Sequence, residues 1–327
     1  MPPRTDILLV SLASTAGLRA SDAALAGALE RAGAEVAVVA AAPQRDVRTF
    51  ALTDLVWARA ARAAARRGIA EHRPRAVVYG AMGAALLWPR PGAIRYDAPM
   101  AANRPGRHGI WQRAVERRRL REAPVLVPVS ETTLAETPEP RADAVVVPIP
   151  VEPSGPPAPL EARDIAAITY AANPEKKGLD LVLTAWIAAR RGGEELWVCG
   201  TEPGQRIDGV RWAGRLPPDE YRALLRRARV FVTAPRREDY GIAQLEALAD
   251  GCQLVTTRAP GPYAALPIAE RLDPRLVGER IVPALRAALD DPVPGYAERA
   301  AAAVAERFGR AAVDARVAGE LLPRLLG

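Results

Sequence analysis

Residues 230–251, VFVTAPRREDYGIAQLEALADG, decide the fold of this chain. The apolar run Val230–Thr233 is typical of a buried strand, and Gly241 opens the amphipathic helix that follows it. Glu238 and Glu246 lie on either side of that helix start. In open α/β sheets, ligands bind beyond the carboxyl ends of the strands. We therefore expect a parallel sheet here, with a ligand site where this strand ends.

The same alternation of strands and helices extends over both halves of the chain, which predicts two doubly wound parallel sheets. In the first half, Ser21 is expected to cap the helix that follows the first strand. The segments expected in the first half are the strands 6–11, 35–41, 76–79, 92–95 and 124–129 and the helices 21–32, 52–72 and 109–121. Those expected in the second half are the strands 165–170, 195–199, 230–233 and 253–257 and the helices 178–190, 219–229, 242–249, 296–308 and 310–326.

A proline-rich stretch separates the two halves. Residues 152–160 read EPSGPPAPL, and four prolines in nine positions are typical of a semi-rigid spacer. We predict an N-terminal domain over residues 1–151 and a C-terminal domain over residues 161–306. The last helix, 307–327, is expected to pack back towards the N-terminal domain.

The composition is that of an ordinary globular protein, with 327 residues, 49% hydrophobic and 25% charged. It excludes a disordered chain, a collagen-like repeat and a coiled coil. Two cysteines, Cys199 and Cys252, cannot form a disulfide framework, and two histidines in the whole chain argue against a histidine-rich metal site. The N-terminal stretch MPPRTDILLVSL lacks the pattern of a secretory signal, so we expect a cytoplasmic protein.

The positive charge lies in the first half. Residues 1–150 hold 21 arginines and 14 acidic residues, a net charge of +7, whereas residues 151–327 hold 24 of each sign. A basic half can face nucleic acid, anionic lipid or a phosphorylated acceptor, or it can be an arginine-rich solvated surface. The charge is spread over several elements and no nucleic-acid module is recognisable, so we expect no nucleic-acid partner. Arg113, Arg117 and Arg121 recur one turn apart on one helix, which predicts peripheral contact with an anionic membrane unless they are paired or simply solvated.

Lysine occurs at only one place in the chain. Against 43 arginines there are two lysines, Lys176 and Lys177, in the segment Asn173–Gly178. Lysine is a compact point charge, while arginine is a planar fork, so a site that needs one charge at one phosphate oxygen favours lysine. The pair could also be a chance feature of the surface. Its position just after the predicted strand 165–170 favours a functional role.

The loops that follow the predicted strands 165–170 and 230–233 should meet at one edge of the second sheet. Lys177 would then lie near the first amides of the helix that begins at Gly241 and near two carboxylates. An acidic helix start alone is explained by the helix dipole. The combination with Lys177 instead suits a diphosphate with a sugar at either end, because the amides and the lysine bind phosphates while each glutamate binds a sugar.

These residues resemble a known family. The stretch 238–251, EDYGIAQLEALADG, resembles the pattern E-G-F-G-L-x-x-x-E-A-M-A-x-G of GT-B glycosyltransferases of family 4. Asn173–Gly178 followed by LDLVLTAW resembles the family's K-G loop and helix. Val210–Gly214, Ala234-Pro235 and Val129–Glu131 resemble shorter family segments. The resemblance covers the C-terminal domain well and the N-terminal domain loosely.

The resemblance implies a GT-B fold, in which two Rossmann-like domains enclose a cleft. It also implies a retaining hexosyltransferase-type enzyme that takes its sugar from a nucleotide-diphosphate donor without a metal or other cofactor. In that family the residue at Glu238 contacts the donor sugar and supports the reacting centre, the one at Glu246 binds the ribose, and the one at Lys177 neutralises the leaving diphosphate. We further expect these residues to line the donor site: Asn173, Trp212, Tyr240, Gly241, Ile242, Ala243 and, from the first domain, Gly17.

The chain departs from the family at several positions. Ala172 stands where the family usually has a phosphate-binding arginine, and either Arg236 or Arg237 could replace it. On the acceptor side, Tyr96 and Asp97 stand where the family often has His-Asp. His108 is a further candidate there, although a single loop histidine is often incidental. The acceptor is unidentified, with a lipid- or phosphate-linked molecule among the alternatives.

A second interpretation keeps the fold but not the turnover. Such a protein would hold a nucleotide sugar, or a partner, as a catalytically weak GT-B-like binding protein. The missing arginine and histidine favour this alternative, and Lys177, Glu238 and Glu246 favour the enzyme. Release of free nucleotide from the donor in the absence of an acceptor would distinguish the two.

Overall fold

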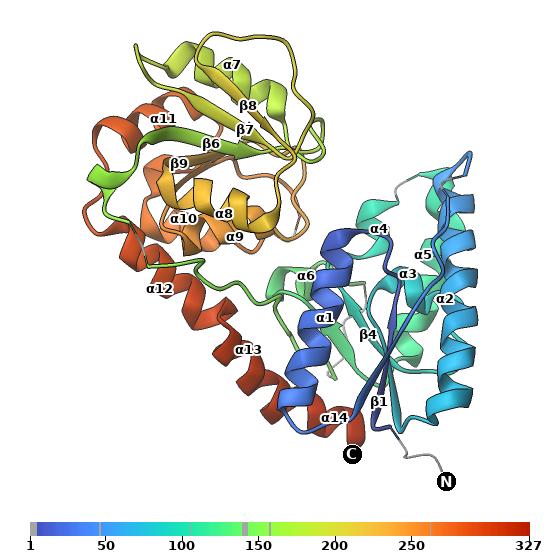
Figure 1. Ribbon diagram of the computed structural model, residues 1–327. Coiled ribbons are helices and arrows are strands. Elements are labelled where there is room, and N and C mark those ends of the chain that lie inside the picture. Colours follow the sequence, from blue (N-terminus) through green and yellow to red (C-terminus); the bar gives the residue numbers. More distant parts are fainter. Residues whose placement is uncertain (1–4, 46, 105, 139–142, 157, 262) are drawn as a thin grey trace. The chain divides into compact units, whose positions relative to one another are not determined.

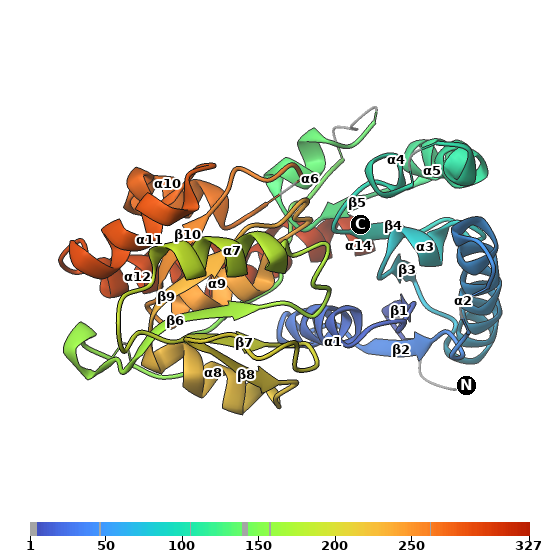
Figure 2. The same ribbon diagram turned by 90° about the horizontal axis from the view of Figure 1, so that it is seen from above.

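The computed structural model describes residues 5–45, 47–104, 106–138, 143–156, 158–261 and 263–327. It divides the chain into two compact α/β units, shown in Figures 1 and 2. Unit 1 consists of Met1–Pro150 together with Ala311–Gly327, and unit 2 of Val151–Arg310. The predicted doubly wound fold is confirmed in both. The cleft predicted between the two units stays a prediction.

Unit 1 is built on a parallel sheet of five strands in the order β2-β1-β3-β4-β5. Its strands are β1 (Ile7–Ser11), β2 (Val36–Ala40), β3 (Ala76–Tyr79), β4 (Ala93–Tyr96) and β5 (Leu126–Pro128). Its helices before residue 150 are α1 (Ala16–Arg31), α2 (Phe50–His72), α3 (Met82–Ala85), α4 (Met100–Asn103), η1 (Arg107–Gly109), α5 (Ile110–Glu122) and α6 (Glu131–Ala135).

Alternate residues of β1 face two different layers of the core, as the period of a strand requires. Ile7 lies in one apolar cluster with Leu25 of α1, and Leu8 lies in the other with Ala61 of α2. The first cluster also receives side chains from the end of the chain, which forms α13 (Arg310–Arg316), the π-helical turn η4 (Val317–Leu321) and α14 (Leu322–Leu326). The C-terminal segment is therefore part of the core of unit 1.

The start of α1 differs from the prediction. The helix begins at Ala16, and the hydroxyl oxygen of Thr15 accepts a hydrogen bond of 3.2 Å from the backbone N–H of Leu18. Ser21 lies inside the helix, so the prediction that it caps the helix was wrong. The hydroxyl of a threonine just outside the first turn satisfies an amide that the helix cannot pair. As a result Gly17 belongs to the first helical turn.

Unit 2 repeats the architecture with a parallel sheet in the order β10-β9-β6-β7-β8. Its strands are β6 (Ile165–Tyr170), β7 (Leu196–Cys199), β8 (Val210–Gly214), β9 (Ala228–Thr233) and β10 (Gln253–Thr256). Its helices are η2 (Leu160–Ala162), α7 (Leu179–Ala189), α8 (Pro218–Arg227), α9 (Ile242–Ala249), α10 (Leu266–Leu272), η3 (Pro274–Leu276), α11 (Ile281–Asp290) and α12 (Tyr296–Phe308). Helix α7 packs against α11, and α9 packs against α12.

The proline-rich stretch 152–160 is held against unit 2. The backbone N–H and the hydroxyl of Ser154 both donate to Oδ1 of Asp250, at 2.8 Å each. Arg222 donates to the carbonyl of Glu152 at 2.8 Å. Residue 157 is outside the described residues. These contacts explain why this stretch, predicted as a spacer, groups with unit 2.

Candidate functional site

The sheet of unit 2 reverses its winding between β6 and β9. From β6 the chain moves outward to β7 and β8, then returns to place β9 on the other side of β6. The loops that follow β6 and β9 therefore leave the sheet in opposite directions, and the gap between them is the usual ligand position in an open α/β sheet. Lys177 lies in the first of these loops and Glu238 in the second.

Lys177 and Glu238 form an ion pair at this switch point. The Lys177 Nζ lies 2.5 Å from Oε2 of Glu238, and the side chains are 18% and 5% exposed. The Gln244 side-chain amide donates to the same oxygen at 2.9 Å. The Glu238 backbone N–H is held by the carbonyl of Pro260 at 3.0 Å. A cation, a nearly buried carboxylate and an amide are thus fixed together at the end of the sheet.

Two glycines allow the loops to come this close. Gly178 has a φ of +61°, and a Cβ there would lie 1.9 Å from the carbonyl oxygen of Ala234. Gly241 has a φ of +87°, and a Cβ there would lie 2.8 Å from the ring of Tyr263. Only glycine adopts such backbone angles at low cost and leaves room for these contacts. The two positions hold Lys177 and the start of α9 in place.

Further ion pairs surround this pair. Lys176 Nζ lies 2.5 Å from Oδ2 of Asp239, and Arg237 Nε lies 2.9 Å from Oδ1 of the same carboxylate. Arg236 contacts Asp180 through both of its terminal nitrogens, at 2.7 and 2.9 Å. Both candidates for the missing phosphate-binding arginine therefore have carboxylate partners of their own in this structure.

Glu246 lies one turn further along α9, in a second charged group. A terminal nitrogen of Arg222 lies 3.8 Å from its carboxylate, and the same guanidinium holds the fully buried Asp250 at 2.6 Å. Burial raises the pKa of Glu246, Arg222 opposes that shift, and the charge of Asp250 adds to it. The ring of Tyr170, at the end of β6, is tilted against that of Tyr221, with centroids 5.1 Å apart.

The other residues predicted at the donor site differ in what they contact. The side-chain oxygen of Asn173 accepts from the Lys176 backbone N–H at 3.0 Å, so it shapes the lysine loop. Tyr240 is buried with its ring edge-on to Phe308. In the first turn of α9, Ile242 is exposed while Ala243 is buried. The backbone amides of that turn, rather than these side chains, face the end of the helix.

Trp212 and Gly17 lie at other places in the fold. The Trp212 indole N–H, on β8, donates to the carbonyl of Gln205 at 3.1 Å. Gly17 is exposed within α1, and a Cβ there would meet no atom within 4 Å. No close approach of the backbone therefore depends on Gly17.

On the predicted acceptor side, Tyr96 and Asp97, at the end of β4, have different surroundings. Tyr96 is buried, and its hydroxyl lies 2.9 Å from that of Thr137. Asp97 lines a pocket, and its carboxylate accepts from the Ala98 backbone N–H at 2.9 Å. The backbone of His108 lies in η1.

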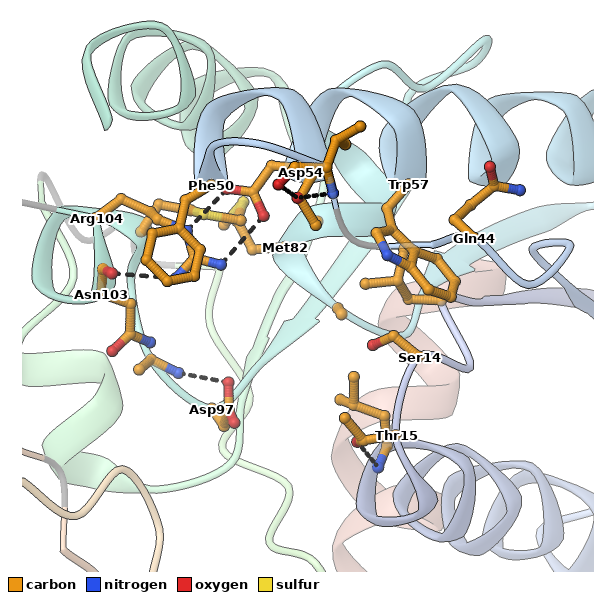
Figure 3. Close-up of a pocket in the computed structure, with 18 of the residues that line it drawn as sticks. Ser14, Thr15, Gln44, Phe50, Asp54, Trp57, Met82, Asp97, Asn103 and Arg104 are labelled. Carbon is orange, nitrogen blue, oxygen red and sulfur yellow. Dashed lines mark hydrogen bonds and ion pairs between the residues drawn. The ribbon is translucent and has the colours of Figure 1, made fainter. Parts of the chain in front are cut away.

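That pocket has a volume of about 990 Å³ and lies at the switch point of unit 1, where the loops after β1 and β3 diverge (Figure 3). The residues that line it are Leu12, Ser14, Thr15, Leu18, Gln44, Val47, Arg48, Thr49, Phe50, Thr53, Asp54, Trp57, Ala81, Met82, Gly83, Asp97, Ala98, Met100, Asn103 and Arg104. Apart from Asp97, sequence analysis did not single these residues out for a site. The spacing of Phe50, Thr53, Asp54 and Trp57 on one helix face was the available signal.

The far wall of this pocket is fixed by buried polar groups. Asp54 accepts from Arg104 at 2.8 and 3.1 Å and from Gln112 at 3.1 Å. Fully buried Glu116 accepts from the backbone N–H groups of Met100 and Ala101, at 2.6 and 3.1 Å. Burial raises the pKa of Glu116, and those two N–H groups oppose the shift. A carboxylate at this position stabilises the N-terminus of α4, because it accepts hydrogen bonds from the first amides of that helix.

Among the described residues, no group of three or more histidine, cysteine or acidic side chains has an arrangement suited to a metal ion. None of the helices in the described part combines the length and the apolar character needed to span a bilayer. Cys199 and Cys252 are buried free thiols, and burial raises the pKa of each to about 12.

Comparisons with known proteins agree with this geometry. Residues 163–289 match the family described as Glycosyl transferases group 1. By sequence, the chain matches no curated protein. The solved structures it resembles include sucrose-phosphate synthase from Thermosynechococcus elongatus, with a TM-score of 0.67 and 16% identity over 98% of this chain and 99% of that one.

Two further structures share the fold over nearly their whole lengths. WaaG, a glycosyltransferase involved in lipopolysaccharide biosynthesis, has a TM-score of 0.69 and 15% identity over 95% of this chain and 98% of that one. An α,α-trehalose-phosphate synthase (UDP-forming) from Burkholderia xenovorans has a TM-score of 0.66 and 14% identity over 99% of this chain and 100% of that one.

The fold and the family match define the class of this protein. The chain has the GT-B fold, and its second unit is a glycosyl transferases group 1 domain, so the protein is a glycosyltransferase. The match covers the segment from Arg163 to Leu289, which contains Lys177, Glu238 and Glu246.

Proposed function

We propose that this enzyme is a retaining, hexosyltransferase-type glycosyltransferase that takes its sugar from a nucleotide-diphosphate donor. The observation that carries the proposal is the Lys177–Glu238 pair at the switch point of unit 2, beside the first turn of α9. A cation next to helix amides suits a diphosphate, and a nearly buried carboxylate suits the hydroxyls of a sugar. The trehalose-phosphate synthase of the same fold is UDP-forming, in line with such a donor.

In this proposal each of the three charged residues binds a different part of the donor. Lys177 and the amides of residues 241–243 bind the diphosphate, and Glu238 contacts the sugar being transferred. Glu246 accepts hydrogen bonds from the ribose. In the structure Lys177 is paired with Glu238. An incoming diphosphate would therefore compete with the Glu238 carboxylate for a lysine that is already in position.

The proposed reaction breaks the bond between the anomeric carbon and the diphosphate oxygen, and the acceptor hydroxyl oxygen bonds to that carbon on the same face. The hydroxyl proton leaves with the diphosphate oxygen. Negative charge grows on the leaving group as the bond breaks, so fixed positive charge near it lowers the barrier. The residues proposed to stabilise that charge are all protein groups, and no metal takes part.

The test is hydrolysis of the donor in the absence of an acceptor, followed by the release of free nucleotide. Steady release that is lost in Lys177→Ala supports an enzyme of this kind. Binding of nucleoside diphosphates without any release supports the alternative, a GT-B-like binding protein. Ala172, in the place of a phosphate-binding arginine, is the observation that keeps that alternative open.

A cytoplasmic location with peripheral contact at an anionic membrane also remains part of the proposal. On α5, Arg117 and Arg121 are exposed, as such a contact needs. Arg113, the third member of the predicted face, donates to the carbonyl of Arg104, so its charge is directed towards the protein. Arg121 donates to the carbonyl of Arg117 at 3.2 Å. Arg118 and Arg119 both pair with Glu122, at 2.6 Å each. We therefore expect a weak contact.

A further inference from the structure

We propose that the pocket of unit 1 binds an uncharged, flat aromatic molecule that carries hydroxyl groups, and that this molecule is the acceptor. The word acceptor rests on the proposed function, whereas the binding of such a molecule does not. A pocket of about 990 Å³ is at the upper end of the usual size for small-molecule sites and has room for a fused or linked ring system.

An aromatic wall runs along one face of α2. Phe50 and Trp57 are seven residues apart, so they lie two turns and about 10 Å apart on the same side of the helix. Figure 3 shows both rings at the pocket, with Thr15 and Ser14 below Trp57. Phe50 is 67% exposed, an unusual state for a phenylalanine. Such a pair offers a long apolar surface to a flat ligand.

Arg104 stiffens one end of this wall. Its guanidinium carbon lies 5.2 Å from the centre of the Phe50 ring, over one face, so a ligand meets the other face. The same guanidinium is held by Asp54 through two hydrogen bonds and donates to the carbonyl of Asn103 at 3.1 Å. The platform is thus fixed from behind by groups that are already paired.

Among the described residues of the lining, the formal charges cancel. The lining contains two arginines, Arg48 and Arg104, and two aspartates, Asp54 and Asp97. Arg104 and Asp54 neutralise each other in an ion pair, with Nε of the arginine 2.8 Å from Oδ2 of the aspartate. Arg48 and Asp97 are both exposed and add one charge of each sign to the same lining. A phosphate needs several converging donors with net positive charge. This lining instead favours a neutral molecule.

Most hydroxyl groups of the lining are engaged in the protein's own turns. Thr15 and Thr49 accept from the amides of Leu18 and Leu52, and Thr53 bonds with both backbone groups of Val47. In the described part of the lining, Ser14 and Asn103 keep a hydroxyl and an amide for a ligand. Few directional groups beside large apolar surfaces suit a hydroxylated ring system better than a sugar, which needs many hydrogen bonds.

The experiment is calorimetric titration of the full chain, without donor, in a slightly acidic buffer that keeps phenols protonated. The probes are kaempferol, a planar flavonol, together with glucose and glucose 6-phosphate. We expect kaempferol to bind at least tenfold more tightly than either sugar. Phe50→Ala should weaken kaempferol binding about five- to tenfold, because a stacking platform is lost. Phe50→Trp, which keeps a platform, should restore it.

The matched control is Leu52→Ala, because Leu52 is 47% exposed on the same helix and does not line the pocket. It should bind kaempferol like the parent. The proposal is overturned if glucose or glucose 6-phosphate binds as tightly as kaempferol, if kaempferol does not bind, or if Phe50→Ala binds it like Leu52→Ala. A substitution of the exposed Phe50 is not expected to unfold the chain, and thermal unfolding of each variant checks this.

The same titration separates this proposal from the proposed function. Kaempferol binding that depends on Phe50, in a protein that never releases nucleotide from a donor, leaves the pocket standing and rejects the transferase activity. Nucleotide release without kaempferol binding rejects the pocket's ligand and leaves the transferase activity standing.

Discussion

The two units place a ligand position at the same point of the same topology, yet they furnish it differently. In unit 2 the loops after β6 and β9 bring Lys177 within 2.5 Å of Glu238, and further ion pairs surround them. In unit 1 the loops after β1 and β3 border a pocket that is lined by aromatic side chains. The positive and negative charges of its described lining residues are equal in number. The fold thus supplies the position, and the side chains decide whether a charged or a neutral molecule suits it.

The largest effect is expected from Lys177→Ala. Turnover of a nucleotide-sugar donor should fall by about 10²–10³-fold, because one preorganised group facing the leaving charge is lost. The matched control is Lys176→Ala, which removes the neighbouring lysine and its bond to Asp239 at the edge of the site. Single-turnover release of nucleotide measures both, and the control should stay within a few-fold of the parent.

Lys177→Arg refines this test. The planar fork should not replace a point charge between Glu238 and a phosphate, so rescue should be poor. Full activity of the arginine variant, or equal losses in the two alanine variants, would contradict the view that Lys177 itself defines the charged site.

The next largest effect separates the two glutamates of unit 2. Glu238→Ala should mainly lower kcat, by about 10²-fold, because its contact is proposed to act at the reacting centre. Glu246→Ala should mainly raise KM, because a ribose contact is the same in the ground and transition states. Steady-state kinetics over a range of donor concentrations decides between the two, and the opposite pattern would show that the assigned roles are exchanged.

A third test compares a glycine from each unit. Gly178→Ala should cost about 1–3 kcal/mol of stability, because a residue with positive φ would carry a Cβ close to the Ala234 carbonyl. It should also slow turnover, since the loops must move apart. Gly17→Ala should be neutral or stabilising, because the position is helical and open. Thermal unfolding and donor binding measure both, and weaker donor binding in Gly17→Ala would restore its predicted role.

A smaller effect concerns the stability of the charged site itself. Since burial raises the pKa of Glu246 in the folded state, that state binds the proton more tightly than the unfolded chain does. Stability therefore falls as the pH rises from the ordinary glutamate range through the raised value, and the loss persists at neutral pH. Glu246→Gln should raise the unfolding temperature near neutral pH and lose this advantage in acid. A lower unfolding temperature at neutral pH would refute it.

The smallest effect is expected at the basic helix of unit 1. Sedimentation with anionic vesicles at low salt should show weak binding that fades as salt is added. The Arg117→Gln/Arg121→Gln double variant should bind less, at about 1 kcal/mol per charge near the lipid, while Arg113→Gln should change little because its side chain faces the protein. Equal binding of all variants would exclude this helix as the contact.

The charged site was more accessible to sequence reasoning than the neutral one. Lys177 and Glu238 stand out because lysine is rare in this chain and because both follow apolar strands, so their meeting at one sheet edge could be predicted. Gln244 could not be assigned to Glu238, since this contact depends on how the first turn of α9 is aimed. The predicted helix 52–72 began after Phe50, which left its aromatic face incomplete.

Cap and core choices were the other points where sequence was insufficient. Thr15 and Ser21 are equally good capping residues, and only the packing of α1 on β1 selects Thr15. Tyr96 is the last residue of β4 and is buried, whereas Asp97 follows the strand and is exposed, so the difference between them depends on where β4 ends. The sequence pattern contains neither piece of information.

The return of the C-terminal segment to unit 1 has a consequence for the order in which the chain matures. Val313, Val317 and Leu321 belong to the same apolar cluster as Ile7, so this core of unit 1 is incomplete until residues 311–327 have been synthesised. Unit 2 is continuous in sequence and needs no such delay. Unit 2 can therefore complete its core before unit 1, the reverse of the usual N-terminal-first order of domain folding. The half proposed to bind the donor can mature first, and the half proposed to choose the acceptor is completed only when residues 311–327 are added.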